Sequence, residues 1–148
     1  MSSKNADVKA IRELMQAHAD AIRARDSARA LGSMALCVTS YQLRPPLEYR
    51  DGAARRTEDM DAWFATWDGP LEIEIPDPTI LVDDDVAVAW GLSRLRGKKR
   101  GGQPIELWYR TTLVFQRQVG MWKLVHHHAS FPTRMDGSET SATDLAPA

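Results

Sequence analysis

Apolar residues recur with helical spacing in three stretches of the first half of the chain. Over residues 7–26 they fall at positions 8, 11, 15 and 22, which predicts an amphipathic helix. A short alanine-rich stretch at 27–36 predicts a second helix, and a periodic stretch at 53–67, closed by glycine and proline, predicts a third. His18 fills the gap in the first apolar series, so we expect its side chain to point inward.

The pattern then changes to the alternation that is typical of β-strands. Turn residues separate the alternating stretches, and Pro45 and Pro46 stop the first of them because neither can donate to a strand ladder. Helices early and strands late predict an α+β fold, with the helices packed on one face of a strongly bent antiparallel sheet. The predicted strands are 38–43, 71–75, 79–82, 86–96, 105–116 and 121–131.

Length and composition predict one globular domain. The 148 residues are 43% hydrophobic and 26% charged, without an internal repeat. We expect the domain to span residues 6–133, with a flexible stretch at 1–5. The Ser/Thr/Ala/Pro-rich segment 134–148 is expected to be disordered.

Net charge and the lack of a targeting pattern argue against nucleic acid and membranes as partners. Nineteen basic and twenty acidic residues leave a net charge of -1, so nothing draws the chain generally to nucleic acid or an anionic membrane. The basic run 94–100 lies at a glycine-bounded hairpin tip without interleaved aromatic residues, which favours a solvated turn. Without a secretory or membrane-spanning pattern we expect a cytoplasmic protein. The single cysteine, Cys37, has small apolar neighbours and is expected to be a buried, inert thiol.

Three of the four histidines are consecutive, within WKLVHHHASFP at residues 122–132. Strand alternation places His126 and His128 on one face and His127 on the other. Both faces also carry apolar residues, which predicts a sheet covered by helices on one side and by a second subunit on the other. The first face is predicted to hold Trp122, Leu124, His126, His128 and Ser130; the second holds Val125, His127, Ala129 and Phe131.

The turn before this strand determines which residues lie opposite the histidines. A three-residue loop ending in Gly120 would put His126 opposite Thr112 and His128 opposite Arg110. It would also put Ser130 opposite Trp108. A two-residue loop is the alternative and would place His128 beside Thr111. We favour the three-residue loop.

Several local motifs then point to a known family. The stretches YQLRPPLEYRDG, WFATWDGPLEIEI, VAVAWGLSRLRG, LWYRTTLVFQR and GMWKLVHHHASFP resemble the SnoaL-like and ketosteroid-isomerase-like proteins of the nuclear transport factor 2-like superfamily. The resemblance covers about residues 6–133. It implies a cystatin-like cone, a pocket between the helices and the concave face of the sheet, and a homodimer. It does not fix the reaction, since the superfamily includes isomerases, cyclases, dehydratases and binding domains.

One position departs from the family pattern. Related sequences tend to have Tyr-Asp-Leu where this chain has Tyr41-Gln42-Leu43. In ketosteroid isomerase an aspartate base removes the substrate proton. A glutamine amide cannot accept a proton near neutral pH, so Gln42 weighs against a plain isomerase.

The predicted site is rich in hydrogen-bond donors and poor in carboxylates. An arginine beside two imidazoles disfavours their protonation unless an anionic group arrives, so we expect a small apolar ligand that carries an anionic oxygen. The predicted catalytic residues are His128, His126, Arg110 and Tyr41. The predicted ligand contacts are His18, Gln42, Trp63, Trp67, Trp108, Thr112, Trp122 and Ser130.

Other interpretations of the histidines stay open. His126 and His128 have the spacing of two metal ligands on one strand, but only His18 could be a third and Arg110 would repel a cation, so we expect no metal and no cofactor. They could equally be hydrogen-bonded structural residues. Two functions follow: an acid–base enzyme of the isomerase, cyclase or hydratase type acting on an apolar carbonyl or carboxylate compound, or a non-catalytic ligand-binding or assembly domain without the aspartate base.

Overall fold

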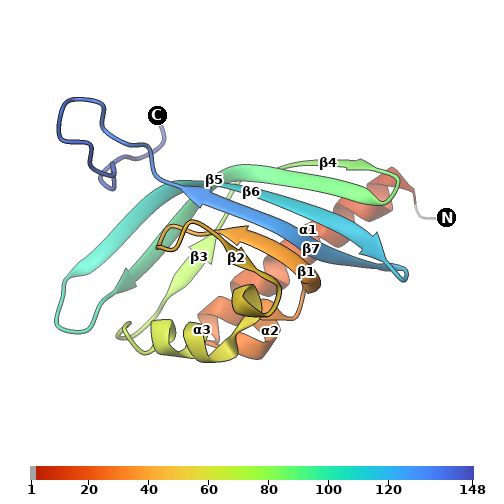
Figure 1. Ribbon diagram of the computed structural model, residues 1–148, viewed down its shortest axis with the longest axis horizontal. Helices are drawn as coiled ribbons and strands as arrows, with labels where there is room; N and C mark the ends of the chain where they lie inside the picture. Colours follow the sequence, from red (N-terminus) through yellow and green to blue (C-terminus); the bar gives the residue numbers. More distant parts are fainter. Residues whose placement is uncertain (1–2) are drawn as a thin grey trace.

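A computed structural model describes residues 3–148, with helices packed against one face of a curved sheet (Figure 1). The first helix begins where Ser3 caps it, since the serine side chain accepts a hydrogen bond from the Ala6 amide at 3.1 Å. The predicted third helix is divided into a 3-10 turn and an α-helix. The helical elements are α1 (Lys4–Arg23), α2 (Ser27–Leu31), η1 (Asp51–Arg55) and α3 (Thr57–Phe64).

The sheet has seven strands in the order β2-β1-β7-β6-β5-β3, with β4 also paired to β5. The prediction of an antiparallel sheet is wrong at one pair, because β1 runs parallel to β7. These two strands are far apart in sequence, so no hairpin dictates their relative direction. The result is a mixed, strongly bent sheet that forms a cystatin-like cone. The strands are β1 (Met34–Tyr41), β2 (Tyr49–Arg50), β3 (Glu72–Glu74), β4 (Thr79–Asp83), β5 (Val86–Lys98), β6 (Pro104–Gln118) and β7 (Met121–Ser130).

The hydrophobic core lies between the helices and the concave face of the sheet. Alternate residues of β5 and β6 point into it, among them Ala89 and Phe115, which are 0% and 2% exposed. From the helices, Ile11 and Ile22 meet them at 0% and 2% exposure. Among residues 3–148 no helix covers the convex face of the sheet (Figure 1), so the two faces of each strand have different surroundings.

The hairpin between β6 and β7 differs from the favoured prediction in two ways. Gln118 pairs with Met121, so the loop has two residues, Val119 and Gly120, both with positive φ (50° and 74°). A bulge then lies between the pairs Phe115–Leu124 and Val114–His126, leaving Val125 as the extra residue. The predicted register is therefore wrong by two residues, since His128 pairs with Thr112 and not with Arg110. The alternative with a two-residue loop has the correct loop length, but without the bulge it places His128 beside Thr111.

The bulge exchanges the faces of every later residue in β7. Trp122 and Leu124 pack in the core on the helix side. Beyond the bulge His127 and Ala129 point to the helix side, while His126 and His128 point to the convex face. The prediction that Trp122 shares a face with His126 and His128 is wrong for this reason.

Two shorter segments also differ from expectation. The second helix ends at Leu31, because β1 already begins at Met34; the prediction had placed Cys37 in a buried setting, whereas its side chain is exposed. After β7, a segment predicted to be disordered folds back as a loop that projects beyond the end of the strand (Figure 1). A bridge between Thr133 and Ser141 closes this loop, and the Ala142 amide donates to the Pro132 carbonyl at 2.7 Å.

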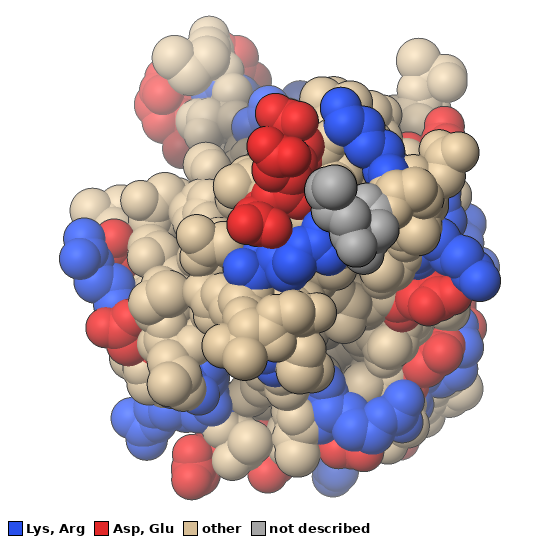
Figure 2. Space-filling model, turned by 90° about the vertical axis from the view of Figure 1, so that its right-hand side faces the viewer, with Lys and Arg blue, Asp and Glu red and all other residues tan. Residues whose placement is uncertain are grey.

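Ion pairs connect several elements of the fold. Arg117 joins the helix α1 to the sheet, with its two Nη atoms 3.1 and 2.9 Å from the carboxylate of buried Asp7 and its Nε 3.0 Å from Asp85. On the face shown in Figure 2, acidic and basic side chains are interspersed. Within residues 3–148 no helix has the length and apolar character to cross a membrane.

Candidate functional site

The sheet divides the predicted site residues into two groups. His126, His128 and Ser130 lie on the convex face, together with their neighbours from β6, because Thr112 pairs with His128 and Arg110 pairs with Ser130. The convex group consists of Tyr41, Trp108, Arg110, Thr112, His126, His128 and Ser130. The concave, helix-covered group consists of His18, Trp63, Trp67 and Trp122.

Tyr41 contacts both convex histidines. Its ring centre lies 4.8 Å from that of His126 and 5.3 Å from that of His128, with edge-to-face geometry in both cases. The Nδ1–H of His126 donates to the Thr39 carbonyl at 2.8 Å, which leaves Nε2 as the unprotonated nitrogen of the neutral ring. Tyr41 therefore lies beside both convex histidines, and its predicted catalytic role stays a prediction.

The tryptophans serve mainly as packing residues. Trp67 and Trp122 are 3% and 8% exposed, and each has an indole N–H without a hydrogen-bond partner. Lys99 Nζ lies 4.1 Å from the ring centre of Trp67, and the Arg117 guanidinium lies 4.4 Å from that of Trp122. Trp108, on the other face, donates from Nε1 to Glu106 at 2.9 Å. The three rings therefore do not form one wall.

A second histidine pair lies on the concave side. His127 Nδ1 is 3.3 Å from the Ser40 hydroxyl, and His18 approaches His127 from α1. Burial, reinforced by repulsion from His18, His126 and His128, lowers the pKa of His127 to about 4. Burial also lowers the pKa of His18, against the opposing effect of its hydrogen bond to Ala30. Both imidazoles are therefore neutral at physiological pH.

The hydrogen bond of His18 fixes its tautomer. Its Nδ1 lies 3.0 Å from the Ala30 carbonyl oxygen, which can only accept, so the proton is on Nδ1. The lone pair of Nε2 is then available on the side of the ring away from that carbonyl. His127 has no such constraint, because the Ser40 hydroxyl can either donate or accept.

Three hydroxyl-bearing residues, Ser93, Tyr109 and Thr111, form a cluster on the concave face of the sheet, which we call the hydroxyl cluster. Ser93 Oγ and Thr111 Oγ1 lie 2.6 Å apart in a buried setting, and Tyr109 bonds to Ser93. Burial raises the pKa of Tyr109 to about 12, more than the bond to Ser93 lowers it. Like an unperturbed phenol, it is protonated at neutral pH and can act as a donor.

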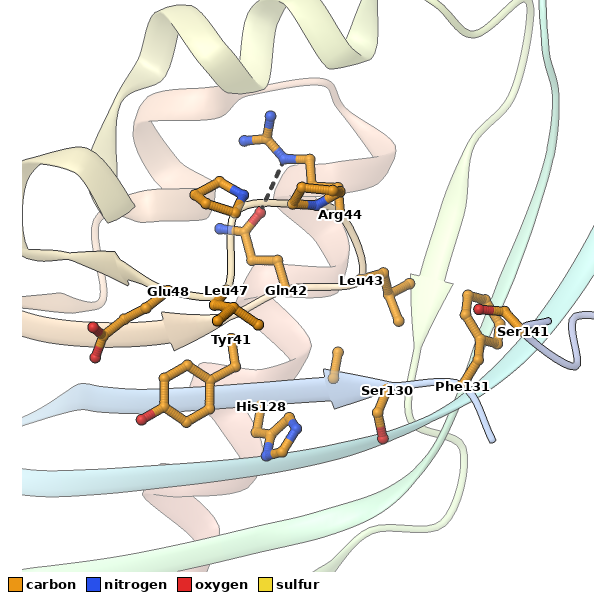
Figure 3. A pocket seen from close by; sticks show the side chains of 13 residues that line it. Tyr41, Gln42, Leu43, Arg44, Leu47, Glu48, His128, Ser130, Phe131 and Ser141 are labelled. Carbon is orange, nitrogen blue, oxygen red and sulfur yellow. Dashed lines mark hydrogen bonds between the residues drawn. The ribbon is translucent and has the colours of Figure 1, made fainter. Parts of the chain in front are cut away.

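A hollow of about 790 Å³ opens at the end of β1 and β7, and we call it the rim hollow. Four of the predicted site residues line it: Tyr41, Gln42, His128 and Ser130. Figure 3 shows Gln42 and Arg44 extending to one side of the loop after β1, and Tyr41, His128 and Ser130 pointing to the other. The rim hollow thus wraps around the edge of the sheet. Its complete lining is Tyr41–Glu48, His128–Phe131 and Ser141.

The rim hollow is adjacent to the partly buried pair of His18 and His127. Ser40 and His127 are register partners on β1 and β7, and Gln42 and Ala129 each lie two residues further along. Gln42 and Ala129 line the rim hollow. Since two residues advance a strand by about 7 Å, the Ser40–His127 pair lies about 7 Å along the same face from this lining. Phe131, which lines the rim hollow, also contacts Tyr109 of the hydroxyl cluster, with ring centres 5.7 Å apart.

The sequence does not predict the interior part of this arrangement. Regular alternation puts His127 on the face away from the predicted site, because the bulge has no sequence signal, and nothing in the pattern singles out Ser40. Alternation along the predicted strands could have placed Ser93, Tyr109 and Thr111 on one face, since Ser93 and Tyr109 are register partners and Thr111 lies two residues after Tyr109. Among residues 3–148 no group of three or more His, Cys, Asp or Glu side chains is arranged to hold a metal ion.

The fold and this arrangement define a cone-shaped small-domain protein with polar groups at its concave face and rim. A family model described as a SnoaL-like domain matches residues 11–134, and the chain belongs to this family. No curated protein matches the chain significantly.

Solved structures share the fold at low sequence identity. An NTF2-like protein of unknown function from Pseudomonas putida KT2440 is 23% identical, with a TM-score of 0.81 over 99% of this chain and 100% of its own. A ketosteroid isomerase-like protein from Erwinia carotovora is 14% identical, with a TM-score of 0.69 over 85% and 96% of the two chains. The association domain of CaMKII from C. elegans is 18% identical, with a TM-score of 0.65 over 86% and 97%. At these identities the likeness establishes the nuclear transport factor 2-like fold alone.

Proposed function

We propose that this SnoaL-like protein binds a small apolar carbonyl compound at the rim hollow and moves a proton with a partly buried, neutral histidine. The observation that carries the proposal is the position of His127. Its imidazole is neutral, bonded to Ser40, and one inward-facing position from the rim hollow. The reaction class is a cofactor-independent isomerisation, cyclisation or hydration.

The basicity of His127 suits proton removal next to a carbonyl. A pKa of about 4 is close to the value of about 4.6 for the aspartate base of ketosteroid isomerase. When His127 Nδ1–H donates to Ser40, the lone pair of Nε2 can take a proton from the carbon next to the carbonyl. The electron pair moves to the carbonyl oxygen as an enolate, and the proton returns to another carbon of the same molecule. His127 would thus supply the base that Gln42 cannot provide.

The enolate oxygen needs hydrogen-bond donors. The phenol of Tyr109 is protonated at neutral pH, as an unperturbed phenol also is, and it lies beside the hydroxyls of Ser93 and Thr111. From the outer part of the rim hollow, Tyr41 and His128 could contact the ligand. Arg110, Trp108 and Thr112 lie on the convex face, on the other side of the sheet from His127 and Tyr109, and we give them no part in the reaction.

Deuterium exchange tests the proposal without knowledge of the natural substrate. The protein is incubated in D₂O with 2-acetylnaphthalene, and deuterium in the methyl group next to the carbonyl is measured by mass spectrometry. We expect exchange above the buffer rate, reduced about 100-fold in His127→Gln. A matched His128→Gln variant should retain most of it. Exchange that is lost only in His128→Gln would assign the base to the convex histidine, and exchange at the buffer rate in the wild type would remove the catalytic proposal.

The alternative is a non-catalytic ligand-binding or assembly domain. The lining of the rim hollow contains one carboxylate, Glu48, which lies 3.0 Å from Arg50 and forms an ion pair with it. The alternative is supported because this lining offers no unpaired carboxylate as a base. The convex face supports assembly: Leu81, Trp90 and Leu92 are 58%, 40% and 44% exposed there. We therefore also propose that two copies of the chain associate through this face.

A further inference from the structure

Arg44 is held in place at the rim hollow from two sides. Its Nε donates to the Gln42 side-chain oxygen at 3.2 Å, and its guanidinium lies 5.0 Å from the ring centre of Tyr49. Tyr49 is itself fixed, since it is only 9% exposed and its hydroxyl donates to the Pro45 carbonyl at 2.6 Å. The guanidinium is therefore positioned before any ligand binds, which lowers the entropic cost of binding.

The charge of Arg44 is not neutralised by the protein. In the part of the chain that the structure describes, no carboxylate forms an ion pair with it. Its neighbour Arg50, by contrast, is paired with Glu48 at 3.0 Å. Because Gln42 occupies only Nε, the two Nη groups of Arg44 can each donate to a further acceptor.

We infer that Arg44 binds a carboxylate of the ligand, so that the compound recognised at the rim hollow is an apolar carboxylic acid. This inference rests on the proposed function, since it names the ligand class of the same site. The two Nη groups match the two oxygens of a carboxylate. The apolar part of the acid would lie against Leu43 and Phe131, which line the same rim hollow.

This assignment explains the glutamine at position 42. A glutamate there would place a negative charge 3.2 Å from Arg44 Nε and would cancel the charge that attracts the ligand. An amide oxygen accepts the same hydrogen bond without a charge. Gln42 is therefore a positioning residue for Arg44, and its inability to act as a base does not count against a ligand site.

The test compares an acid with its neutral amide. Binding of 2-naphthoate and 2-naphthamide is measured by NMR titration of the wild type, Arg44→Gln, Gln42→Glu and Arg110→Gln, with Arg100→Gln as an exposed-arginine control outside the rim hollow. We expect the wild type to bind the acid about tenfold more tightly than the amide, which is the effect of a charge-assisted hydrogen bond at a partly solvated site. Arg44→Gln and Gln42→Glu should both lose this preference, while Arg100→Gln should retain it. Thermal melting confirms that each variant is folded.

The other outcomes overturn the inference in distinguishable ways. Equal binding of acid and amide by the wild type would reject the carboxylate but leave a small-molecule site. Loss of the preference in Arg110→Gln, with Arg44→Gln unchanged, would transfer the anion site to the convex face. Binding of neither probe at millimolar concentration would reject both this inference and the proposed ligand site.

Discussion

Leu124 and His127 lie on the same, helix-covered face of β7 although they are three residues apart. In a regular strand residues separated by an odd number point to opposite faces, and here the bulge at Val125 restores them to one side. The histidine that faces the interior is therefore the middle one of the three.

Chemical labelling should distinguish the histidines by their positions. His128 is exposed, whereas His127 and His18 are partly buried between α1 and the sheet. Diethyl pyrocarbonate should modify His128 rapidly and His127 at least tenfold more slowly, as read by mass spectrometry of peptides. Faster labelling of His127 than of His128 would contradict the bulge.

The stability of the protein should fall in mild acid because of His127. Its pKa is about 4 in the folded chain and about 6.5 in the unfolded chain, so the unfolded chain binds more protons below pH 6.5. This contribution is fully present above pH 6.5 and is lost as the pH falls towards 4, by at most about 3 kcal/mol. The lowered pKa of His18 acts in the same direction.

Urea unfolding at pH 7.0 and 4.5 measures this effect. The difference in the free energy of unfolding between the two pH values should be smaller in His127→Gln than in the wild type. His128→Gln is the matched control and should preserve the wild-type difference. An unchanged difference in His127→Gln would mean that another group governs the acid sensitivity.

The Asp7–Arg117 pair should stabilise the attachment of α1 to the sheet. Asp7 is 5% exposed and receives both Nη atoms of Arg117, so its removal leaves a partly buried cation without its main partner. Asp7→Asn should lower the free energy of unfolding by about 3 kcal/mol. Asp85→Asn removes a partner whose side chain is 72% exposed and should cost less than about 1 kcal/mol. Equal costs for the two variants in urea denaturation would contradict this account.

The convex face should control the oligomeric state. Leu92→Glu places a charge among exposed apolar residues of that face and should convert a dimer to a monomer in light scattering coupled to size-exclusion chromatography. Met135→Glu, at a side chain that is 82% exposed on the C-terminal segment, is the matched control and should leave the mass unchanged. A monomeric wild type would reject the proposed dimer.

The sequence predicts the elements of this fold well because their signals are local. The apolar series from Val8 to Ile22 describes α1, and alternation with flanking turns describes the later strands. The family motifs then indicate the cone. The parallel pairing of β1 with β7 could not be predicted in this way, since it depends on contacts between distant segments.

The site was predicted less well, and two small errors account for most of the difference. The favoured loop was one residue too long, because a two-residue turn with Val119 at positive φ is unusual for a β-branched residue. The bulge then added a second one-residue shift at Val125, an ordinary strand residue. The shifts together preserve which residues share a face, so Arg110, Thr112 and His128 do lie together, but on the opposite side of the sheet from Trp122.

The inserted Val125 also affects how relatives should be compared. A homologue with a regular strand at this point would place the residue aligned with His126 or His128 at the interior, and the residue aligned with His127 outside. A column-by-column alignment would then pair an interior histidine with a surface residue. Functional histidines within this family are therefore better matched by the face of the strand that they occupy than by their order in the sequence.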